Sequence, residues 1–363
     1  MAIPAKMKAQ VFYEPEKMKL ESRPVPQPAP HEVLVKVKAV GICGSDVAYY
    51  YGKSSLETPN GKGPLILGHE FSGEVVAAGK EAEQKGGFHP GDRVVVNPVQ
   101  SNPEGKWSKK GLSNLDDEKR VLGVSVDGGL AEYCVSSYHW TVKVPQNLSL
   151  DQAAATEPLA CAVYAINNLN IEKGQFVVVF GPGPIGLMMV QLAKSKGAAK
   201  VMLVGTRDYR LEHGKALGAD VLVNTDRPES PYYAKDLAKK VREANEGELA
   251  DRAVTSTSSL TAIHAALAIT GKHSTVVVFG LPGDKDVIQV PALQSILMDK
   301  TIRYSWLAPN TWPEAVDSLA KGKVKVDQIL SHHFELDGLA EAIKKVRARE
   351  DNCLKALIKV AEG

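Results

Sequence analysis

Three glycines with the spacing G-x-G-x-x-G lie in the middle of the chain, in the segment Gly181-Pro182-Gly183-Pro184-Ile185-Gly186. The apolar run Phe176 to Phe180 precedes the segment, and a helical pattern from Leu187 to Lys196 follows it. In such a setting the glycines permit a tight turn, close approach of a pyrophosphate, and packing of helix on strand. The helix N-terminus adds free N–H groups. The segment therefore predicts a dinucleotide site, with a plain structural turn as the alternative.

The residues after the next strand bear on which dinucleotide is bound. Gly205 stands where an Asp or Glu normally accepts the ribose hydroxyls of NAD. Without that carboxylate nothing repels a 2′-phosphate, which Thr206, Arg207 and Arg210 could bind through charge-assisted hydrogen bonds. The sequence therefore favours NADP over NAD. Two alternatives stay open: the arginines face solvent with Asp208 as a helix cap, or Asp208 reaches a ribose hydroxyl of NAD.

A second group of residues has the chemistry of a metal site. Cys43 lies in the segment GICGSD at 41–46, and His69 and Glu70 are adjacent. A thiolate and an imidazole suit zinc, and a carboxylate can complete a set of three protein ligands with one position open for catalysis. On these residues alone, a buried free cysteine and an ordinary surface His-Glu pair would be the alternative.

The composition is that of a soluble globular protein of about two domains, with 363 residues, 44% of them hydrophobic and 24% charged. The net charge of +2, with no block of like charge, does not indicate nucleic acid or a membrane surface as a partner. No stretch approaches the roughly 18 apolar residues of a membrane helix, and Met1 to Lys8 lacks a signal-peptide core. We therefore expect a cytoplasmic protein. Its four cysteines, widely separated, do not indicate a disulfide framework.

The elements that must position these residues follow two patterns. Short strands divided by turns fill the first third, at Lys8–Phe12, Glu32–Val40, Gly73–Gly79 and Arg93–Asn97. From about Gln175, strands at Val201–Val204, Val221–Asn224, Arg252–Thr255 and Thr275–Phe279 alternate with helices at Leu211–Leu217, Ala234–Glu243 and Leu260–Ile269. Alternation of this kind predicts a doubly wound parallel sheet. The tail from Trp312 to Glu362 adds two helical patterns around a strand, which we expect to return to the first domain.

In its motifs and their order the chain resembles the medium-chain, zinc-dependent alcohol and polyol dehydrogenases over essentially its whole length. The matching segments are GICGSD at 41–46, LGHEFSGEV at 67–75, PGDRVVV at 90–96, DGGLAEY at 127–133, EPLAC at 157–161, GPGPIG at 181–186, LGAD at 217–220 and NTWPEA at 310–315. GSDV-x-YY at 44–50 and NTWP at 310–313 resemble the sorbitol, xylitol and threonine dehydrogenases in particular. The resemblance implies an α/β fold: a GroES-like, β-rich catalytic domain at 1–158, a Rossmann domain at 159–298, and a returning catalytic segment at 299–363.

The resemblance also implies an enzyme that transfers a hydride between a secondary alcohol, such as a polyol or sugar alcohol, and NAD(P). Cys43, His69 and Glu70 would surround one catalytic zinc, with Glu157 as a ligand directly or through a water. Asp46 would hold His69 in its metal-binding tautomer. The zinc would lower the pKa of the substrate alcohol, so that an alkoxide forms and hydride leaves for the nicotinamide.

Three residues of this region are candidates for catalysis. Ser45 would hydrogen-bond the substrate hydroxyl and carry its proton away, Glu70 would act beside the metal, and Tyr49 lies in the segment shared with polyol dehydrogenases. Ser45 as a simple turn hydroxyl remains an alternative. A second alternative is that Glu157, directly before Pro158, is only an acid at the start of a helix, where its charge interacts favourably with the helix dipole.

Three departures from the family limit what can be carried over. Asn97 to Asp127 is a polar stretch without the four cysteines of the family's structural-zinc lobe, so we expect one zinc per chain. Ala48 replaces a histidine that relays protons in many relatives, so Ser45, a ribose hydroxyl or water must do so. Trp306-Leu307-Ala308 replaces a Phe-Arg-Tyr segment that helps to hold polyols. Losing those donors, each worth about 1 kcal/mol or more, makes sorbitol a doubtful substrate, unlike a smaller or differently substituted secondary alcohol.

Two other classes of protein remain as alternatives. A metal-free NADPH quinone or enone reductase shares the fold but lacks the Cys-His-Glu set, and a non-catalytic nucleotide-binding relative would have lost the chemistry. For this chain the resemblance to the zinc-dependent dehydrogenases implies a homodimer that continues the parallel sheets across a two-fold axis, doubled to a homotetramer. The sequence leaves open the natural substrate, its stereochemistry and the direction of the reaction.

Overall fold

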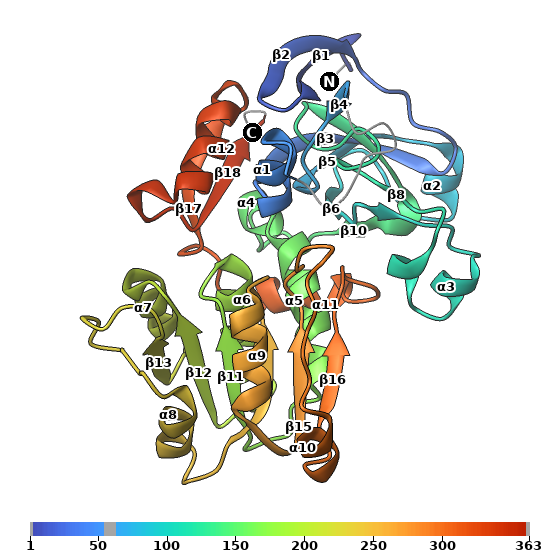
Figure 1. The fold of residues 1–363 in the computed structure, drawn as a ribbon. Coiled ribbons are helices and arrows are strands. Elements are labelled where there is room, and N and C mark those ends of the chain that lie inside the picture. The colour runs from blue at the N-terminus through green and yellow to red at the C-terminus, as the bar shows by residue number, and fades with distance from the viewer. Residues whose placement is uncertain (1–2, 54–62, 361–363) are drawn as a thin grey trace. The chain divides into compact units, whose positions relative to one another are not determined.

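The computed structural model describes residues 3–53 and 63–360, which divide into two compact units (Figure 1). The first unit comprises residues 1–158, 309–321 and 329–363, and the second comprises residues 159–308 and 322–328. The chain therefore returns to the first unit at Pro309, not at residue 299 as the sequence suggested. The reason is strand β16 (Thr301–Tyr304), which pairs in parallel with β15 (Thr270–Val278) inside the sheet of the second unit.

The second unit is built on a six-stranded parallel sheet with the order β13-β12-β11-β14-β15-β16. Counted along the chain this order is 3-2-1-4-5-6, that of dinucleotide-binding sheets. Its other strands are β11 (Phe176–Phe180), β12 (Lys200–Gly205), β13 (Val221–Asn224) and β14 (Ala250–Thr255). Its helices are α6 (Pro184–Ser195), α7 (Asp208–Ala216), α8 (Leu237–Ala244), α9 (Leu260–Ala268) and α10 (Ala292–Leu297). Every residue of β11 is buried, as expected for a central strand covered on both faces.

The first unit contains a seven-stranded sheet, β10-β6-β5-β3-β18-β17 with β9 beside β3, and a smaller sheet, β2-β1-β4. The large sheet holds β3 (Glu32–Gly41), β5 (Glu70–Ala78), β6 (Arg93–Val96), β9 (Tyr133–Ser137), β10 (Thr141–Lys143), β17 (Leu330–Glu335) and β18 (Lys355–Lys359). The small one holds β1 (Lys6–Glu14), β2 (Lys17–Pro24) and β4 (Leu65–Ile66). Strand β18 pairs antiparallel with β3, which brings the end of the chain beside Gly41.

Helices of the first unit are short. They are α1 (Gly44–Tyr50), α2 (Lys80–Gln84), α3 (Lys106–Lys109), α4 (Leu150–Ala153), α11 (Trp312–Ala320) and α12 (Leu339–Ala348), and α5 (Thr156–Leu169) continues into the second unit. Single 3₁₀ turns occur at Ser113–Leu115, Tyr138–Trp140, Leu336–Gly338 and Glu350–Asn352. Helices α11 and α12 flank β17 as the sequence predicts, whereas β18 was not expected. No helix among the described residues has the length and apolar character needed to cross a membrane.

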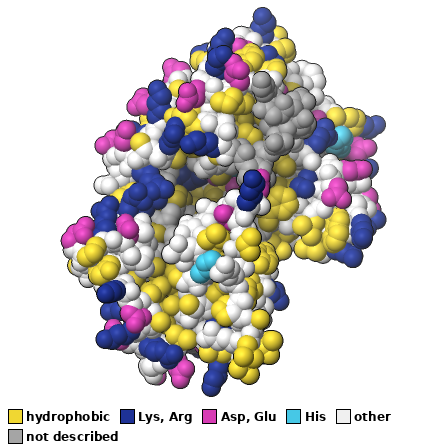
Figure 2. Space-filling view, viewed as in Figure 1, with side chains coloured by type: hydrophobic (Ala, Val, Ile, Leu, Met, Phe, Trp, Pro, Cys, Tyr) yellow, Lys and Arg dark blue, Asp and Glu magenta, His cyan; other side chains and the backbone are white. Residues whose placement is uncertain are grey.

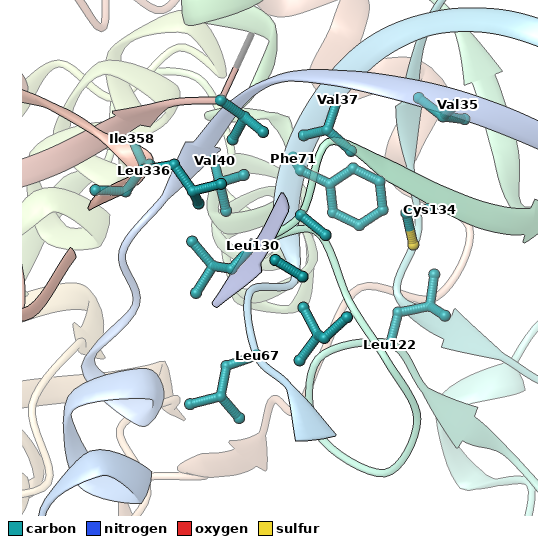
Figure 3. Close-up of a cluster of buried hydrophobic side chains, with 14 of the residues drawn as sticks. Val35, Val37, Val40, Leu67, Phe71, Leu122, Leu130, Cys134, Leu336 and Ile358 are labelled. Atoms are coloured by element: carbon teal, nitrogen blue, oxygen red, sulfur yellow. The ribbon is translucent and has the colours of Figure 1, made fainter. Parts of the chain in front are cut away.

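A hydrophobic cluster lies at the centre of the first unit. Figure 3 shows Val40 of β3, Phe71 of β5 and Ile358 of β18 gathered around Leu130. Three of these side chains come from three different strands, Leu130 precedes β9, and each is almost fully buried. The cluster fixes β3 and β5 against each other, and the ends of these two strands carry the candidate metal ligands.

The stretch from Asn97 to Asp127, expected to be a polar loop, contains some regular structure. Strands β7 (Val99–Gln100) and β8 (Arg120–Val121) pair antiparallel, and α3 lies between them in the chain. Asp116 joins the beginning and the end of this stretch. The two oxygens of the Asp116 carboxylate accept hydrogen bonds from the backbone N–H groups of Asn102 at 3.1 Å and Glu118 at 3.0 Å. A carboxylate and backbone donors thus hold this segment together.

Candidate metal centre and nucleotide site

The antiparallel pairing of β3 with β5 brings the candidate metal ligands together. Gly41, at the end of β3, is the register partner of Glu70, at the start of β5. Cys43 follows two residues after β3 and is the N-cap of α1, while His69 directly precedes β5. As a result, ligand atoms of Cys43, His69 and Glu70 all lie within 4.8 Å of one another.

Asp46 connects the two halves of this cluster. One of its oxygens accepts a hydrogen bond from the backbone N–H of Cys43 at 2.9 Å, and the other lies 3.5 Å from Nδ1 of His69. The latter oxygen and Nδ1 are both buried, and neither has a hydrogen-bond partner among the described residues. Asp46 therefore favours the tautomer of His69 with a proton on Nδ1, which leaves the Nε2 lone pair for a metal.

The electrostatics of the cluster fit a cation. Burial lowers the pKa of the His69 imidazole, but the Asp46 carboxylate and the Cys43 sulfur outweigh burial and hold that pKa well above its usual range. Three of the acidic groups that gather here, Asp46, Glu70 and Glu157, are each at most 8% exposed. Buried anions require a metal, a proton or a paired cation. A thiolate, an imidazole and a carboxylate are zinc ligands, so the residues present fit zinc.

Lys355 is a residue of this cluster that the sequence did not indicate. It is 4% exposed, and its ammonium lies 2.5 Å from Oε2 of Glu70 and donates to the carbonyl of Ile42 at 3.2 Å. Burial lowers the pKa of this ammonium, but Glu70, Cys43 and Glu157 raise it above its usual range overall. Glu70 thus lies beside the Lys355 ammonium and would also be within reach of a metal held by the cluster.

Gly41 makes room for this arrangement. A Cβ at this position would overlap Oε2 of Glu70 and lie 2.9 Å from Cε of Lys355. A side chain at this position would therefore displace the Glu70 carboxylate, the Lys355 side chain or both. The only sign of Lys355 in the sequence is a single charge within the otherwise apolar run from Leu354 to Ile358.

The remaining predicted residues of the first unit lie near the cluster in the sequence or in the fold. Ser45 is half-buried in the first turn of α1, two residues after Cys43. Tyr49, 7% exposed, belongs to the hydrophobic cluster of the first unit. Glu157 is in the first turn of α5 and acts electrostatically on Lys355, but it is outside the group of ligand atoms within 4.8 Å. The roles of these three residues stay predictions.

The glycine segment forms the turn between β11 and α6. Gly181 has a φ of +96°, which favours glycine, and Gly183 is the N-cap of α6. A Cβ added to Gly183 would meet no atom within 4 Å, whereas one added to Gly186 would overlap the carbonyl oxygen of Gly181. The second glycine therefore opens the space that a pyrophosphate needs, and the third allows the helix to pack closely. The turn thus fits a dinucleotide.

The predicted selectivity residues surround the start of α7. Gly205 ends β12, Thr206 is exposed, Arg207 is the N-cap of α7, and the Nε of Arg210 donates to the hydroxyl of Tyr209 at 2.8 Å.

Asp208 is therefore not the cap of α7. Its Oδ1 instead accepts hydrogen bonds of 2.7 Å from both Asn224 and Ser230. These two bonds lower the pKa of Asp208, so it stays ionised.

A dinucleotide-binding sheet and a buried Cys-His-Glu cluster on one chain define a metal-dependent, nicotinamide-linked oxidoreductase. Residues 29–146 match the alcohol dehydrogenase GroES-like domain family, and residues 184–321 match the zinc-binding dehydrogenase family. The chain is 33% identical to sorbitol dehydrogenase of Ovis aries over 350 residues, 96% of this chain and 95% of the relative. It therefore belongs to the zinc-dependent medium-chain dehydrogenases, in the sorbitol and polyol dehydrogenase subgroup, and it is an NAD(P)-dependent alcohol or polyol dehydrogenase.

Two solved structures illustrate the range of cofactors within this fold. A protein of Sinorhizobium meliloti 1021, described as a zinc-binding dehydrogenase and bound to NADP, has a TM-score of 0.89 and 26% identity, covering 98% of this chain and all of its own. An alcohol dehydrogenase of Escherichia coli CFT073 in complex with NADH has a TM-score of 0.88 and 28% identity, with the same coverage. Zinc and a nicotinamide cofactor thus fit this chain.

Proposed function

We propose that this enzyme oxidises a secondary alcohol with NADP, using one zinc held by Cys43, His69 and Glu70. The observation that supports this proposal most strongly is the meeting of these three ligands within 4.8 Å, beside a buried carboxylate and a buried ammonium. Glu157 is proposed as a further ligand, directly or through a water. Zinc content and alcohol-dependent NADPH formation, measured on the same preparation, test the proposal. Zinc-free protein with undiminished alcohol oxidation would overturn it.

Each residue of the cluster has a distinct part in the proposed reaction. When bound, zinc supplies Lewis acidity at the substrate oxygen. Ser45 accepts the proton of the substrate hydroxyl and passes it to a ribose hydroxyl or to water, because Ala48 offers no imidazole. Asp46 keeps the His69 ring oriented, and Lys355 offsets the charge of Glu70 whenever that carboxylate is not a ligand. A bound nicotinamide would accept the hydride from the substrate carbon.

The proposed preference for NADP rests on the start of α7. Gly205 offers no carboxylate, Asp208 already accepts two hydrogen bonds, and Arg207 and Arg210 provide positive charge. A 2′-phosphate would bind such a group through charge-assisted hydrogen bonds. Comparing kcat/KM for NADP and NAD tests the preference, and a tenfold or greater preference of the wild-type enzyme for NAD would refute it.

The substrate proposal is a secondary alcohol smaller than sorbitol or differently substituted. Trp306, Leu307 and Ala308 provide one indole N–H and no cationic group or phenol. The relative from Ovis aries is a sorbitol dehydrogenase, so sorbitol is the natural reference compound. Oxidation rates for a panel of polyols, sugars, diols and hydroxy-amino acids would rank the candidates. If sorbitol gave the highest kcat/KM of the panel, this part of the proposal would be wrong.

We also infer a homodimer joined at the edge of the parallel sheet, with a tetramer as the expected higher assembly. The edge strand β16 exposes Tyr304 (66%), and α10 exposes Leu293, Ile296 and Leu297 at 70–75%. Figure 2 shows yellow side chains gathered around this end of the second unit. Apolar surface of this kind normally marks an interface. Light scattering that finds only monomer at micromolar concentration would refute the inference. A cytoplasmic location stays a prediction.

A further inference from the structure

At the nucleotide site, the ring of Pro182 occupies the space that a side chain at position 205 would need. A Cβ added to Gly205 would lie 2.5 Å from Cγ and 2.6 Å from Cδ of Pro182, and 3.4 Å from a methyl group of Leu211. Real Cβ atoms essentially never come within 3.0 Å of such atoms. The proline ring cannot rotate away, because it is closed onto its own backbone nitrogen. The space beside Gly205 is therefore filled by a rigid neighbour.

This crowding is local. Pro182 is the residue between the first two glycines of the segment. The adjacent Gly183 would meet nothing within 4 Å if it carried a Cβ. One side of the turn is thus open toward the expected pyrophosphate, and the other is closed against Gly205. Gly205 is the position at which dinucleotide sheets normally place the acid that binds the ribose hydroxyls of NAD. The closed side of the turn is therefore the side that selects the cofactor.

We propose that Pro182 and Gly205 form one cofactor-selecting pair, in which the proline ring keeps any carboxylate out of the ribose position. The inference rests on the proposed preference for NADP and adds a second determinant to it, beyond the absence of an acid and the presence of two arginines. Asp208 is poorly placed to substitute, because Oδ1 of its carboxylate accepts from Asn224 and Ser230. A single Gly205→Asp exchange, which the sequence alone would suggest as a route to NAD, should therefore fail.

The proposal is tested by a double-mutant cycle on the zinc-containing enzyme, with dissociation constants for NADH and NADPH from fluorescence titration. The variants are Gly205→Asp and Pro182→Ala, alone and combined. Gly205→Ala, alone and with Pro182→Ala, is the uncharged control. With Pro182 present, both exchanges at Gly205 should weaken the binding of NADH and of NADPH by about tenfold or more, because the added Cβ distorts the turn.

With Ala at position 182 the two exchanges should differ. Pro182→Ala/Gly205→Ala should bind both cofactors within about threefold of Pro182→Ala, because the added methyl now has room. Pro182→Ala/Gly205→Asp should shift the ratio of the two dissociation constants toward NADH by about tenfold or more, through repulsion of the 2′-phosphate and acceptance of ribose hydrogen bonds.

Two results would overturn the proposal. One is a Gly205→Asp variant that binds NADH as tightly as the double variant does. The other is an equal ratio of the NADH and NADPH dissociation constants in the two double variants. This result can be obtained even if the single variants at Gly205 do not fold. Failure of the proposed function looks different, because the wild-type enzyme itself would then bind NADH more tightly than NADPH.

Discussion

The metal cluster and the nucleotide turn are built in opposite ways. The cluster gathers ionisable side chains from three places, the N-terminus of α1, the start of β5 and β18, and buries all of them except Cys43, which is partly exposed. The turn is one contiguous segment in which side chains are absent: Gly183 leaves open the space proposed for the ligand, and Gly186 allows close packing of the helix. The cluster should therefore be sensitive to removal of a side chain, and the turn to addition of one. Four predictions test this contrast.

The largest effect is expected from Cys43→Ala. Loss of the thiolate ligand should abolish alcohol oxidation, because metal binding needs the full ligand set. The dissociation constant for NADPH should change by no more than about twofold, since the nucleotide turn belongs to the other unit. Cys134→Ala is the matched control, because Cys134 is a buried cysteine outside the metal cluster. Equal turnover in the two variants would disprove the metal assignment.

The next effect concerns the buried ion pair. Lys355→Met leaves Glu70 without its cation and should lower the free energy of unfolding by about 3–5 kcal/mol. Lys359→Met, on the same strand, removes a partly exposed pair with Asp151 and should cost about 1 kcal/mol or less. Urea unfolding of the zinc-free protein compares the two, because bound zinc would itself compensate the charge of Glu70. Similar losses would show that Lys355 does not compensate a buried charge.

A smaller effect is expected from the arginines at the start of α7. Arg207→Ala and Arg210→Ala should each weaken NADPH binding by about 1.5–3 kcal/mol while leaving NADH binding nearly unchanged. The two effects need not add, because both side chains would act on one phosphate. Arg242→Ala serves as the control, since Arg242 donates to a backbone carbonyl at the end of α8. A parallel loss of NADH binding would contradict a role in phosphate recognition.

The two glycines of the turn should separate binding from folding. Gly186→Ala should lower the free energy of unfolding by about 1–3 kcal/mol, because its methyl group overlaps the Gly181 carbonyl. Gly183→Ala should keep the wild-type melting temperature. It should weaken the binding of both cofactors by at least about tenfold, because the methyl group occupies the space of the pyrophosphate. Unfolding curves and cofactor titrations on both variants would decide. The reverse pattern would contradict the assignment of the turn.

The sequence predicted the second unit better than the first, and the reason is local. Strand β11 and helix α6 have contiguous apolar patterns, so their order alone indicates a doubly wound sheet. The exception in the second unit is strand β16, which is mostly exposed and has no such apolar pattern. The domain boundary predicted at residue 299 was therefore wrong. Strand β2 is also mostly exposed and was not predicted.

The candidate site shows the same limit. Cys43, His69 and Glu70 are close to strand ends and could be identified from motifs. Lys355 could not, because its position depends on the pairing of β18 with β3, more than three hundred residues away in the chain. Such long-range pairing leaves no periodic signal in the sequence.

The most direct test of the account is the zinc content of purified wild-type enzyme and of Cys43→Ala, measured by elemental analysis at known protein concentration. The account predicts one zinc per wild-type chain, because Asn97 to Asp127 contains no cysteine and Asp116 holds that segment together. It predicts essentially none in Cys43→Ala. Two tightly held zinc ions per wild-type chain, or an unchanged zinc content in the variant, would contradict it.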